Sequence, residues 1–591
     1  MRRRLRSAPA IALLLAGPLA GQAPGSALQR VQMHAELGTE AELYGISGRE
    51  GRRPGQSARV FFTPTFTYKS LSLSLNLLLS TENGSTAGLG ALPGRQRLNQ
   101  IGIVPRWAWG KAYLGSFSDN YTPLTWSGVR VDGAGFELNP GLLRFGIIGG
   151  SSRQPVLGGA TTGSFGRRLA GGKLGVGRKS EFGGPGTFLD VVFLRVWDDP
   201  SSLPPGDSLP IPINPDSVIV EPDTALLPRL PIDPYAVTPQ ENAVLATSGG
   251  LSLLGGAVAW SGEVAGSVYS RDRRAEAIAP ELLGGYPGIF RSLVTPRSGT
   301  SVDYAYRSKL EVRIDRLPGS TPSSPRSLTA SIGYESTGPG YVSLGTAFLP
   351  NDIRGVELRT ALRTRRMTLQ LDGARSHDNL AGQKLATTFR GRSGITLILQ
   401  PLRAWHAMAR LNDVSMTRDV ADSVGAVDYS ALVFNTSHSY VPATRSWLRG
   451  LTLSYTFQRI GDDDPSRAGT TLRSHSAEVR AALGLSPRAT LTPALGLVRA
   501  RTGLDPAATR ATYSLAGEWR SANRRLVQSV AVSRSEQART RSLSARVSSR
   551  FQLNTGDALS LVVRLSQYRS VAARATNFDE RVVSLGWARQ I

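Results

Sequence analysis

A period-two alternation of apolar and polar residues runs through most of the chain and limits its fold more than any other feature. In the segment 70–80, which reads SLSLSLNLLLS, leucines occupy every second position, and the positions between them are serine or asparagine except for one leucine. The same alternation continues at 303–315, 451–458 and 542–553. Successive side chains of a β-strand point to opposite faces, so each segment is predicted to be a strand with one apolar and one polar face.

Soluble β-sandwiches also alternate, but three further features favour a membrane barrel. The strands run about 10 residues or more, the length that a tilted strand needs to cross a bilayer. They continue from about residue 31 almost to the last residue, without a helical domain between them. Short turns alternate with longer polar loops, as in outer-membrane barrels; the turns are at Thr364–Arg366, Ser521–Asn523 and Asn554–Gly556. Because an open sheet would leave unpaired edges in lipid, the sheet is expected to close.

The predicted fold is therefore all-β, a transmembrane antiparallel β-barrel of roughly 22–26 strands. Residues 28–591 are expected to form this one domain, with long loops near 81–99, 118–130, 198–241 and 271–300. The proline-rich, acidic loop 198–241 favours a surface excursion over a folded plug, and 271–300 could hold a short helix.

The apolar strand faces predict which side chains contact lipid. These residues are Leu71, Leu73, Leu75, Tyr304, Tyr306, Leu451, Leu453, Leu543 and Val547. The C-terminal segment Arg581–Ile591 resembles the last strand by which outer-membrane barrels are recognised for insertion, although it ends in Ile and carries Arg589 on its apolar face.

The first 27 residues are predicted to be an export signal. Four arginines between Arg2 and Arg6 are followed by the apolar segment Ala8–Ala20, and cleavage is expected between Ala20 and Ala27. The expected location is the bacterial outer membrane. The chain contains no Cys, which excludes a disulfide and a thiolate metal or redox site.

The net charge of +25 comes mainly from arginine. Guanidinium groups suit phosphate and carboxylate, so the expected partners are lipopolysaccharide, other outer-membrane lipids or an anionic solute. Export argues against nucleic acid, and the barrel-assembly machinery is an expected partner during insertion. Arginine that simply lines a hydrated lumen is an equally good interpretation.

Several segments between about residues 100 and 400 resemble one group of proteins. They are 106–150 (RWAWGKAYLG to LRFGIIGG), 238–250 (TPQENAVLATSGG), 262–272 (GEVAGSVYSRD), 334–352 (YESTGPGYVSLGTAFLPND) and 377–388 (HDNLAGQKLATT). Together they resemble large predicted outer-membrane β-barrel proteins of Bacteroidota-type and Gemmatimonadota-type bacteria. The resemblance implies a barrel in the outer membrane and brings no activity with it.

Motifs for catalysis, metals and cofactors are weak. None of the five histidines, His34, His377, His406, His438 and His475, has a paired metal spacing. Gly171–Gly177 fits a turn or a strand of small residues better than a phosphate loop, and Asp462–Asp464 fits solvated charge better than a calcium site. In Ser474-His475-Ser476 both serines point away from the histidine face, which is poor geometry for a nucleophile. The chain is predicted not to be an enzyme and to need no cofactor or metal.

Two functions remain open: a pore or transporter for small solutes, anions among them, and a surface or scaffold protein that transports nothing. Possible lumen-lining residues on the polar strand faces are Arg480, Arg534, Arg546, Arg550 and Arg564. Their charge would attract anions, and pairing with Glu478 and Glu518 would weaken that attraction.

Overall fold

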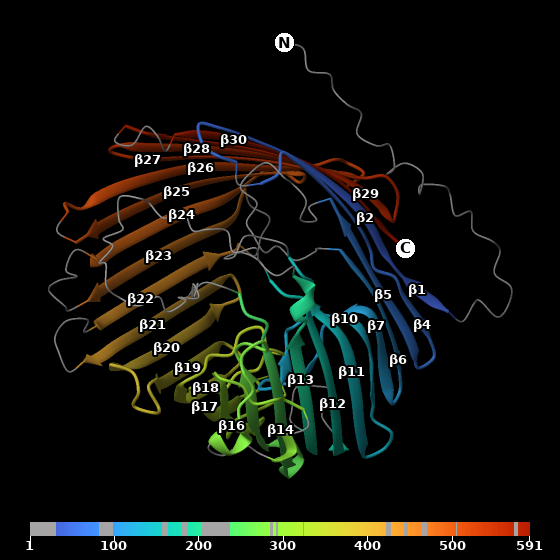
Figure 1. Cartoon of the computed structure of the whole chain (residues 1–591). Helices are drawn as coiled ribbons and strands as arrows, with labels where there is room; N and C mark the ends of the chain where they lie inside the picture. Colours follow the sequence, from blue (N-terminus) through green and yellow to red (C-terminus); the bar gives the residue numbers. More distant parts are fainter. Residues whose placement is uncertain are drawn as a thin grey trace, which may run out of the picture.

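The computed structural model describes residues 31–591, apart from 82–98, 157–163, 179–185, 204–236, 284–287, 291–292, 421–426, 443–446, 463–469, 572–576 and the single positions 52, 323 and 504. The predicted export signal therefore lies outside the described residues, as do Asp463 and Asp464 and most of the loop 198–241. The described part is all-β, and its strands form one closed antiparallel barrel (Figure 1).

The strands follow one another around the wall in chain order. The first part of the wall consists of β1 (Gln32–His34), β2 (Glu36–Ser47), β3 (Gln56–Phe62), β4 (Thr65–Tyr68), β5 (Leu71–Ser80), β6 (Gln100–Trp107), β7 (Gly110–Phe117), β10 (Val131–Leu138), β11 (Leu143–Arg153), β12 (Arg167–Arg178), β13 (Thr187–Asp198), β14 (Glu241–Leu253) and β15 (Val258–Ser270). The second part consists of β16 (Thr300–Ile314), β17 (Ser327–Thr337), β18 (Ile353–Arg363), β19 (Met367–His377), β20 (Ala386–Leu402), β21 (Trp405–Val420), β22 (Val427–Tyr440), β23 (Leu448–Asp462), β24 (Leu472–Ser486), β25 (Ala489–Thr502), β26 (Ala508–Arg520), β27 (Leu526–Gln537), β28 (Thr540–Gln552), β29 (Asp557–Ser570) and β30 (Phe578–Gln590). A separate short hairpin, β8 (Asn120–Thr122) with β9 (Trp126–Ser127), stands apart from the wall.

The barrel closes between its first and last strands. β2 pairs with β30 from Glu36 opposite Gln590 to Ser47 opposite Asp579, and Figure 1 shows these strands side by side. β1 and β2 are two parts of one interrupted strand, and so are β3 and β4, because β1 pairs with β4 and β2 with β3. The 28 strand segments of the sheet, less these 2 continuations, give 26 strands. The prediction of a large antiparallel barrel is confirmed.

Strict alternation separates an outer row from an inner row on each strand. The register places all nine residues that were predicted to contact lipid on the outer row, where leucines, valines and tyrosines are exposed on strand after strand. For example, Leu453 lies opposite Val479, which lies opposite Leu495, and all three are exposed. This continuous apolar exterior is the surface that a barrel presents to lipid.

The connections differ between the two ends of the barrel. The three short turns predicted from the sequence join β18 to β19, β26 to β27 and β28 to β29, at the end where the C-terminus lies. The four long interruptions predicted from the sequence lie at the opposite end. In the described part of these connections the hairpin β8–β9 and three short 3-10 turns form: η3 (Pro200–Ser202), η6 (Pro280–Leu282) and η7 (Gly288–Phe290). A further 3-10 turn, η5 (Leu254–Gly256), joins β14 to β15 at the end with the short turns. Among the described residues, no helix has the length and apolarity to cross a membrane.

Candidate functional site: a loop plug and a charged recess in the lumen

One side of the barrel has an apolar inner wall, although the lumen of such barrels is usually polar. On β13, Val192, Leu194 and Val196 point inward and are completely buried, while Leu189 and Val191 point outward and are exposed. Both faces of this strand are therefore apolar. An inner apolar face that is hidden from water must be covered by another part of the chain.

The first cover is the loop 118–130, which turns into the lumen and contains the hairpin β8–β9. Trp126 is completely buried there, with its ring centroid 5.3 Å from that of Tyr121 and 6.0 Å from that of Phe117 on β7. The indole N–H donates to the carbonyl of Val129 at 3.0 Å. The indole thus anchors the loop to the wall without leaving its polar atom unpaired.

The second cover is the loop 338–352, which packs against the first. Burial raises the pKa of Tyr341, and the charge of Glu263 raises it further, so its hydroxyl stays protonated and donates to the carbonyl of Leu124 at 2.8 Å. Ser343 donates to the carbonyl of Thr125 at 2.5 Å. A Cβ at Gly345 would lie 2.3 Å from Cδ2 of Leu194, so this loop needs glycine to approach the wall. We call the two loops together the plug.

Two inner-row side chains of the wall hold both parts of the plug. Asn242 on β14 is completely buried; its amide donates to the carbonyl of Val342 at 2.8 Å and accepts the N–H of Leu344 at 3.1 Å. Glu263 on β15 accepts the N–H of Leu124 at 3.2 Å. An unpaired buried polar group costs about 1–3 kcal/mol, so these contacts specify where the plug docks.

The end of the second loop is fixed by Asp352, which is buried. Its carboxylate accepts the N–H groups of Asn379 at 3.0 Å and Leu380 at 2.8 Å, and it pairs with Lys384. Burial works against the charged carboxylate, but Lys384 and the two N–H groups outweigh burial and hold the pKa of Asp352 below its ordinary value. The plug is therefore tied to the neighbouring loop by a carboxylate that stays ionised at neutral pH.

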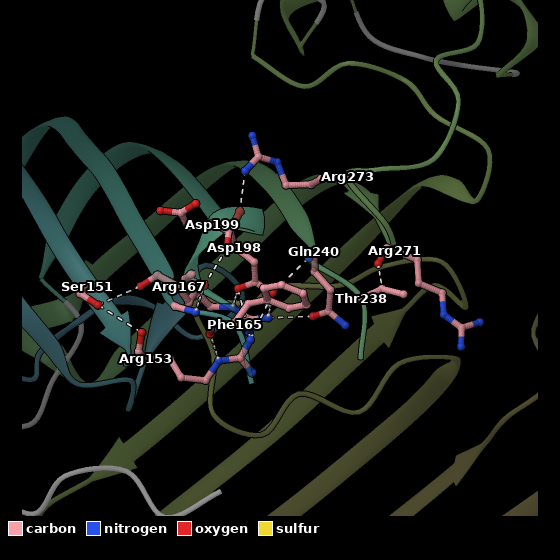
Figure 2. Close-up of polar contacts among 12 residues, drawn as sticks. Ser151, Arg153, Phe165, Arg167, Asp198, Asp199, Thr238, Gln240, Arg271 and Arg273 are labelled. Atoms are coloured by element: carbon pink, nitrogen blue, oxygen red, sulfur yellow. Dashed lines mark hydrogen bonds and ion pairs between the residues drawn. The ribbon is translucent and has the colours of Figure 1, made fainter. Parts of the chain in front are cut away.

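A second buried carboxylate, Asp198, lies at the lumen mouth (Figure 2). Arg167 donates to both of its oxygens, at 2.7 and 3.0 Å, and Arg153 donates to both at 3.2 and 3.1 Å. The N–H of Gln240 donates to Asp198 at 3.0 Å, and Arg273 donates to its carbonyl at 2.5 Å. Asp198 thus holds together the two ends of the loop 199–240 and the start of the next long loop.

Beside the plug the lumen contains a recess of about 860 Å³. Tyr121, Thr122 and Pro123 of the plug form one side, and the inner rows of β15 to β20 form the other. Its charged inner-row residues are Glu263, Arg307, Lys309, Glu311, Glu335, Glu357, Arg359, Arg390 and Arg392.

The five basic and four acidic side chains of the recess nearly balance in charge, and two of the basic groups share one carboxylate. One oxygen of Glu357 is shared by Arg359 at 2.6 Å and Arg392 at 2.8 Å. Lys309 pairs with Glu311 at 3.2 Å, and Arg390 pairs with Asp378 at 3.4 Å. Arg307 lies in register between Glu263 and Glu335. One carboxylate cannot neutralise two guanidinium groups, so Arg359 and Arg392 form a site that suits a small carboxylate or phosphate.

The register also places the five arginines that were predicted to line the lumen. Arg480, Arg546, Arg550 and Arg564 lie on inner rows, opposite in direction to the exposed leucines and valines of their strands. Arg534 instead lies on the outer row, because it has the same parity as Val530 and Val532 and stands opposite Leu543 and Tyr513. This placement differs from the sequence-based expectation and corrects it.

The charges on the inner rows of the last strands are partly paired. Arg480 pairs with Glu478 at 2.7 Å, and Arg520 pairs with Glu518 at 2.7 Å, as the sequence suggested for the two glutamates. No described carboxylate forms an ion pair with Arg546, Arg550 or Arg564. Arg510, on the inner row of β26, likewise forms no ion pair with a described carboxylate.

The remaining chemical candidates are spread over the wall. His475 lies on the outer row and its Nδ1 is 2.9 Å from the hydroxyl of Tyr455, while Ser474 and Ser476 lie on the inner row. Gly171–Gly177 is part of strand β12, as expected. Within the described ranges, no group of three or more metal-ligating side chains comes together.

The plug itself was missed from sequence, although signals for it exist. The segment TFLDVVFLRVWD of β13 is apolar on both faces, which indicates that both are covered. The loop 118–130 was recognised as an interruption with Tyr121 and Trp126, and the loop 338–352 was not recognised. Asn242 and Ser343 carry no recognisable motif, because their roles arise from contacts between distant segments.

No protein-family model matches the chain, and no curated protein sequence is similar to it. Its fold is similar to that of solved outer-membrane barrels. The P pilus usher PapC translocation pore is 11% identical over 95% of this chain and 99% of that chain, with a TM-score of 0.35. The ferric enterobactin receptor PfeA from Pseudomonas aeruginosa is 11% identical over 95% and 81%, with a TM-score of 0.43. A BenF-like porin from Pseudomonas fluorescens Pf-5 is 11% identical over 95% and 99%, with a TM-score of 0.29.

At these identities the likeness is one of architecture and carries no argument about activity. The chain is a large β-barrel that matches bacterial outer-membrane barrels. The plug enters from the end with the long connections, which in bacterial outer-membrane barrels in general is the extracellular end.

Proposed function

We propose that the protein is an outer-membrane pore or transporter for small solutes and that it favours anions. The observation that carries this proposal is the incomplete cover of the lumen by the described residues. The plug buries the inner wall around β11–β15, whereas inner-row side chains elsewhere stay accessible: Arg359 at 60%, Arg480 at 56% and Arg520 at 61%. Barrels of about 16–18 strands already enclose an aqueous channel, and this one is wider.

The preference for anions rests on two features of the wall. The recess holds Glu357 between two arginines, and strands β28 and β29 carry three inner-row arginines without a carboxylate partner among the described residues. Positive charge on a low-dielectric wall raises the local concentration of anions. A solute that passes the plug would meet the recess first.

A second function, a surface or scaffold protein that transports nothing, is favoured by the plug itself. Its hydrogen bonds to Asn242 and Glu263 are those of a fixed lid on the wall. In either role we propose a protein without catalytic activity, and membership of the Bacteroidota-type or Gemmatimonadota-type barrel group stays a prediction.

The deciding measurement is the current through the purified barrel in a planar bilayer under a salt gradient. We expect an anion-selective reversal potential. The double variant Arg546→Glu, Arg550→Glu should lower the anion-to-cation permeability ratio by about twofold or more, because it inverts charge in the lumen. Arg534→Glu is the matched control: it makes the same change on the outer row and should leave selectivity unaltered. Cation preference would contradict the proposed selectivity for anions, whereas no current for any variant would contradict the pore and favour the scaffold.

A further inference from the structure

A row of arginines crosses the outer surface near the extracellular ends of β23, β24 and β25. Arg459 lies directly opposite Arg473, and Arg473 lies directly opposite Arg501. All three are exposed, and Arg499 stands beside them opposite His475. Strict alternation puts them on the same side of the wall as Leu453, Val479 and Leu495, which is the side that faces lipid.

Among the described residues, no carboxylate neutralises this row. Like charges directly opposite each other on neighbouring strands are destabilising, yet no described carboxylate pairs with Arg459, Arg473 or Arg501. At the level of Arg459, the outward carboxylate in register is Asp413, which is two strands away, on the far side of Leu432. Asp428 lies on the outer row of the neighbouring strand β22, four residues from Leu432. Farther round the same rim, outer arginines are compensated: Arg534 and Arg541 share Glu536, and Arg569 pairs with Asp579.

Aromatic side chains lie directly below the row. The guanidinium of Arg473 lies 5.9 Å from the ring centroid of Phe457, and the His475 ring lies 5.0 Å from the same ring. The hydroxyl of Tyr455 bonds to His475. Amphipathic rings at this level are typical of the boundary between the apolar core and the headgroups of a membrane.

The height of the row agrees with that boundary. Arg459 is 459 − 453 = 6 residues from Leu453, and Arg473 and Arg501 are equally far from Val479 and Leu495. At ~3.3 Å per residue this is ~20 Å along the strand, or ~15 Å along the membrane normal for a strand tilted by ~40°. The apolar band of such barrels is ~25 Å tall. With Leu453, Val479 and Leu495 taken as its middle, arginines ~15 Å above them lie among the headgroups of the outer leaflet.

We propose that Arg459, Arg473 and Arg501 form a binding site for the phosphate groups of lipopolysaccharide. Neighbouring strands lie ~4.8 Å apart, so the row spans ~10 Å, which suits a headgroup with more than one phosphate better than a phospholipid with one. Guanidinium binds phosphate in a bidentate manner, and bound phosphates remove the repulsion within the row. This site is independent of whether the lumen conducts.

The test measures binding of a bisphosphorylated lipid A to the purified barrel in neutral detergent by native mass spectrometry. We expect Arg459→Gln, Arg473→Gln, Arg501→Gln together to weaken binding by about tenfold or more, since three charge-assisted contacts are lost. The control removes three compensated arginines from the same rim, as Arg534→Gln, Arg541→Gln, Arg569→Gln, and should change binding less than about twofold. Dephosphorylated lipid A should bind the native barrel as weakly as bisphosphorylated lipid A binds the row variant.

Thermal unfolding without lipid separates this role from a structural one. Removing like charges should leave the unfolding temperature of the row variant unchanged or higher, and added lipid A should raise it less than in the native protein. Equal loss of binding in both triple variants would overturn the proposal. So would equal binding of dephosphorylated lipid A, equal binding of a phospholipid with one phosphate, or a row variant that is destabilised without lipid.

Discussion

Trp126→Ala is expected to detach the plug while the barrel stays folded. Trp126 is completely buried between the plug and the wall, and truncating a buried Trp costs about 3–5 kcal/mol. The strands keep their backbone hydrogen bonds, so the substitution reduces the free energy with which the loop 118–130 docks and leaves the wall in place. Because the loop 338–352 bonds to Leu124 and Thr125, it should loosen with the first loop.

A cysteine under the plug reports this change, because the chain contains no cysteine of its own. Ala246 lies on the inner row of β14 and is 1% exposed. A thiol introduced by Ala246→Cys should resist a water-soluble maleimide in the native background and react at least about tenfold faster with Trp126→Ala. Channel conductance should rise in parallel if the lumen conducts.

Two controls make the result specific. Ser560→Cys, on an exposed inner-row position of β29, should react at the same rate in both backgrounds. Trp447→Ala removes an indole that is 72% exposed and should leave Ala246→Cys protected. If Ala246→Cys reacts quickly in the native barrel, or stays protected with Trp126→Ala, Trp126 does not hold the plug.

The wall could be predicted from the sequence because its determinants are local. Side chains alternate at every residue, and the pairing of β27 with β26 and β28 proceeds without a bulge, so one apolar run fixes the facing of a whole strand. The same rule shows why Arg534 was misplaced. Its charge suggested a lumen position, whereas its parity with Val530 and Val532 assigns it to the outer row, near the end of β27.

The plug could not be predicted in the same way, because its contacts join segments that are far apart in sequence. Ser343 and Thr125 are 218 residues apart, and Asn242 is 102 residues from Leu344. No local pattern states that these groups meet. The absence of a polar face on β13 is the one local sign that its inner face is covered, and it does not say by which loop.

Leu453→Arg is expected to impair assembly far more than Thr452→Arg. Leu453 lies on the outer row between His438 and Val479, where a charged side chain near the bilayer midplane costs about 2–4 kcal/mol. At about 1.4 kcal/mol per tenfold change, this is about 30-fold to 1,000-fold in the folding equilibrium. Thr452 lies on the inner row opposite Arg480, so an arginine there stays hydrated and meets only screened repulsion.

The cost of an outer-row arginine should also fall with height along the same strand. Arg459 is a native outer residue 6 positions from Leu453, and Phe457 lies between them. Phe457→Arg should therefore destabilise the barrel less than Leu453→Arg, because its guanidinium reaches the headgroups.

Urea unfolding of the barrel refolded into phosphatidylcholine vesicles gives the free energy of unfolding of each of the three variants, and migration of unheated samples in SDS gives the folded fraction. Equal destabilisation by Leu453→Arg and Thr452→Arg would show that the two rows do not face lipid and lumen. Equal destabilisation by Leu453→Arg and Phe457→Arg would still agree with the facing of the rows. It would contradict the claim that Phe457 and the arginine row lie near the headgroups.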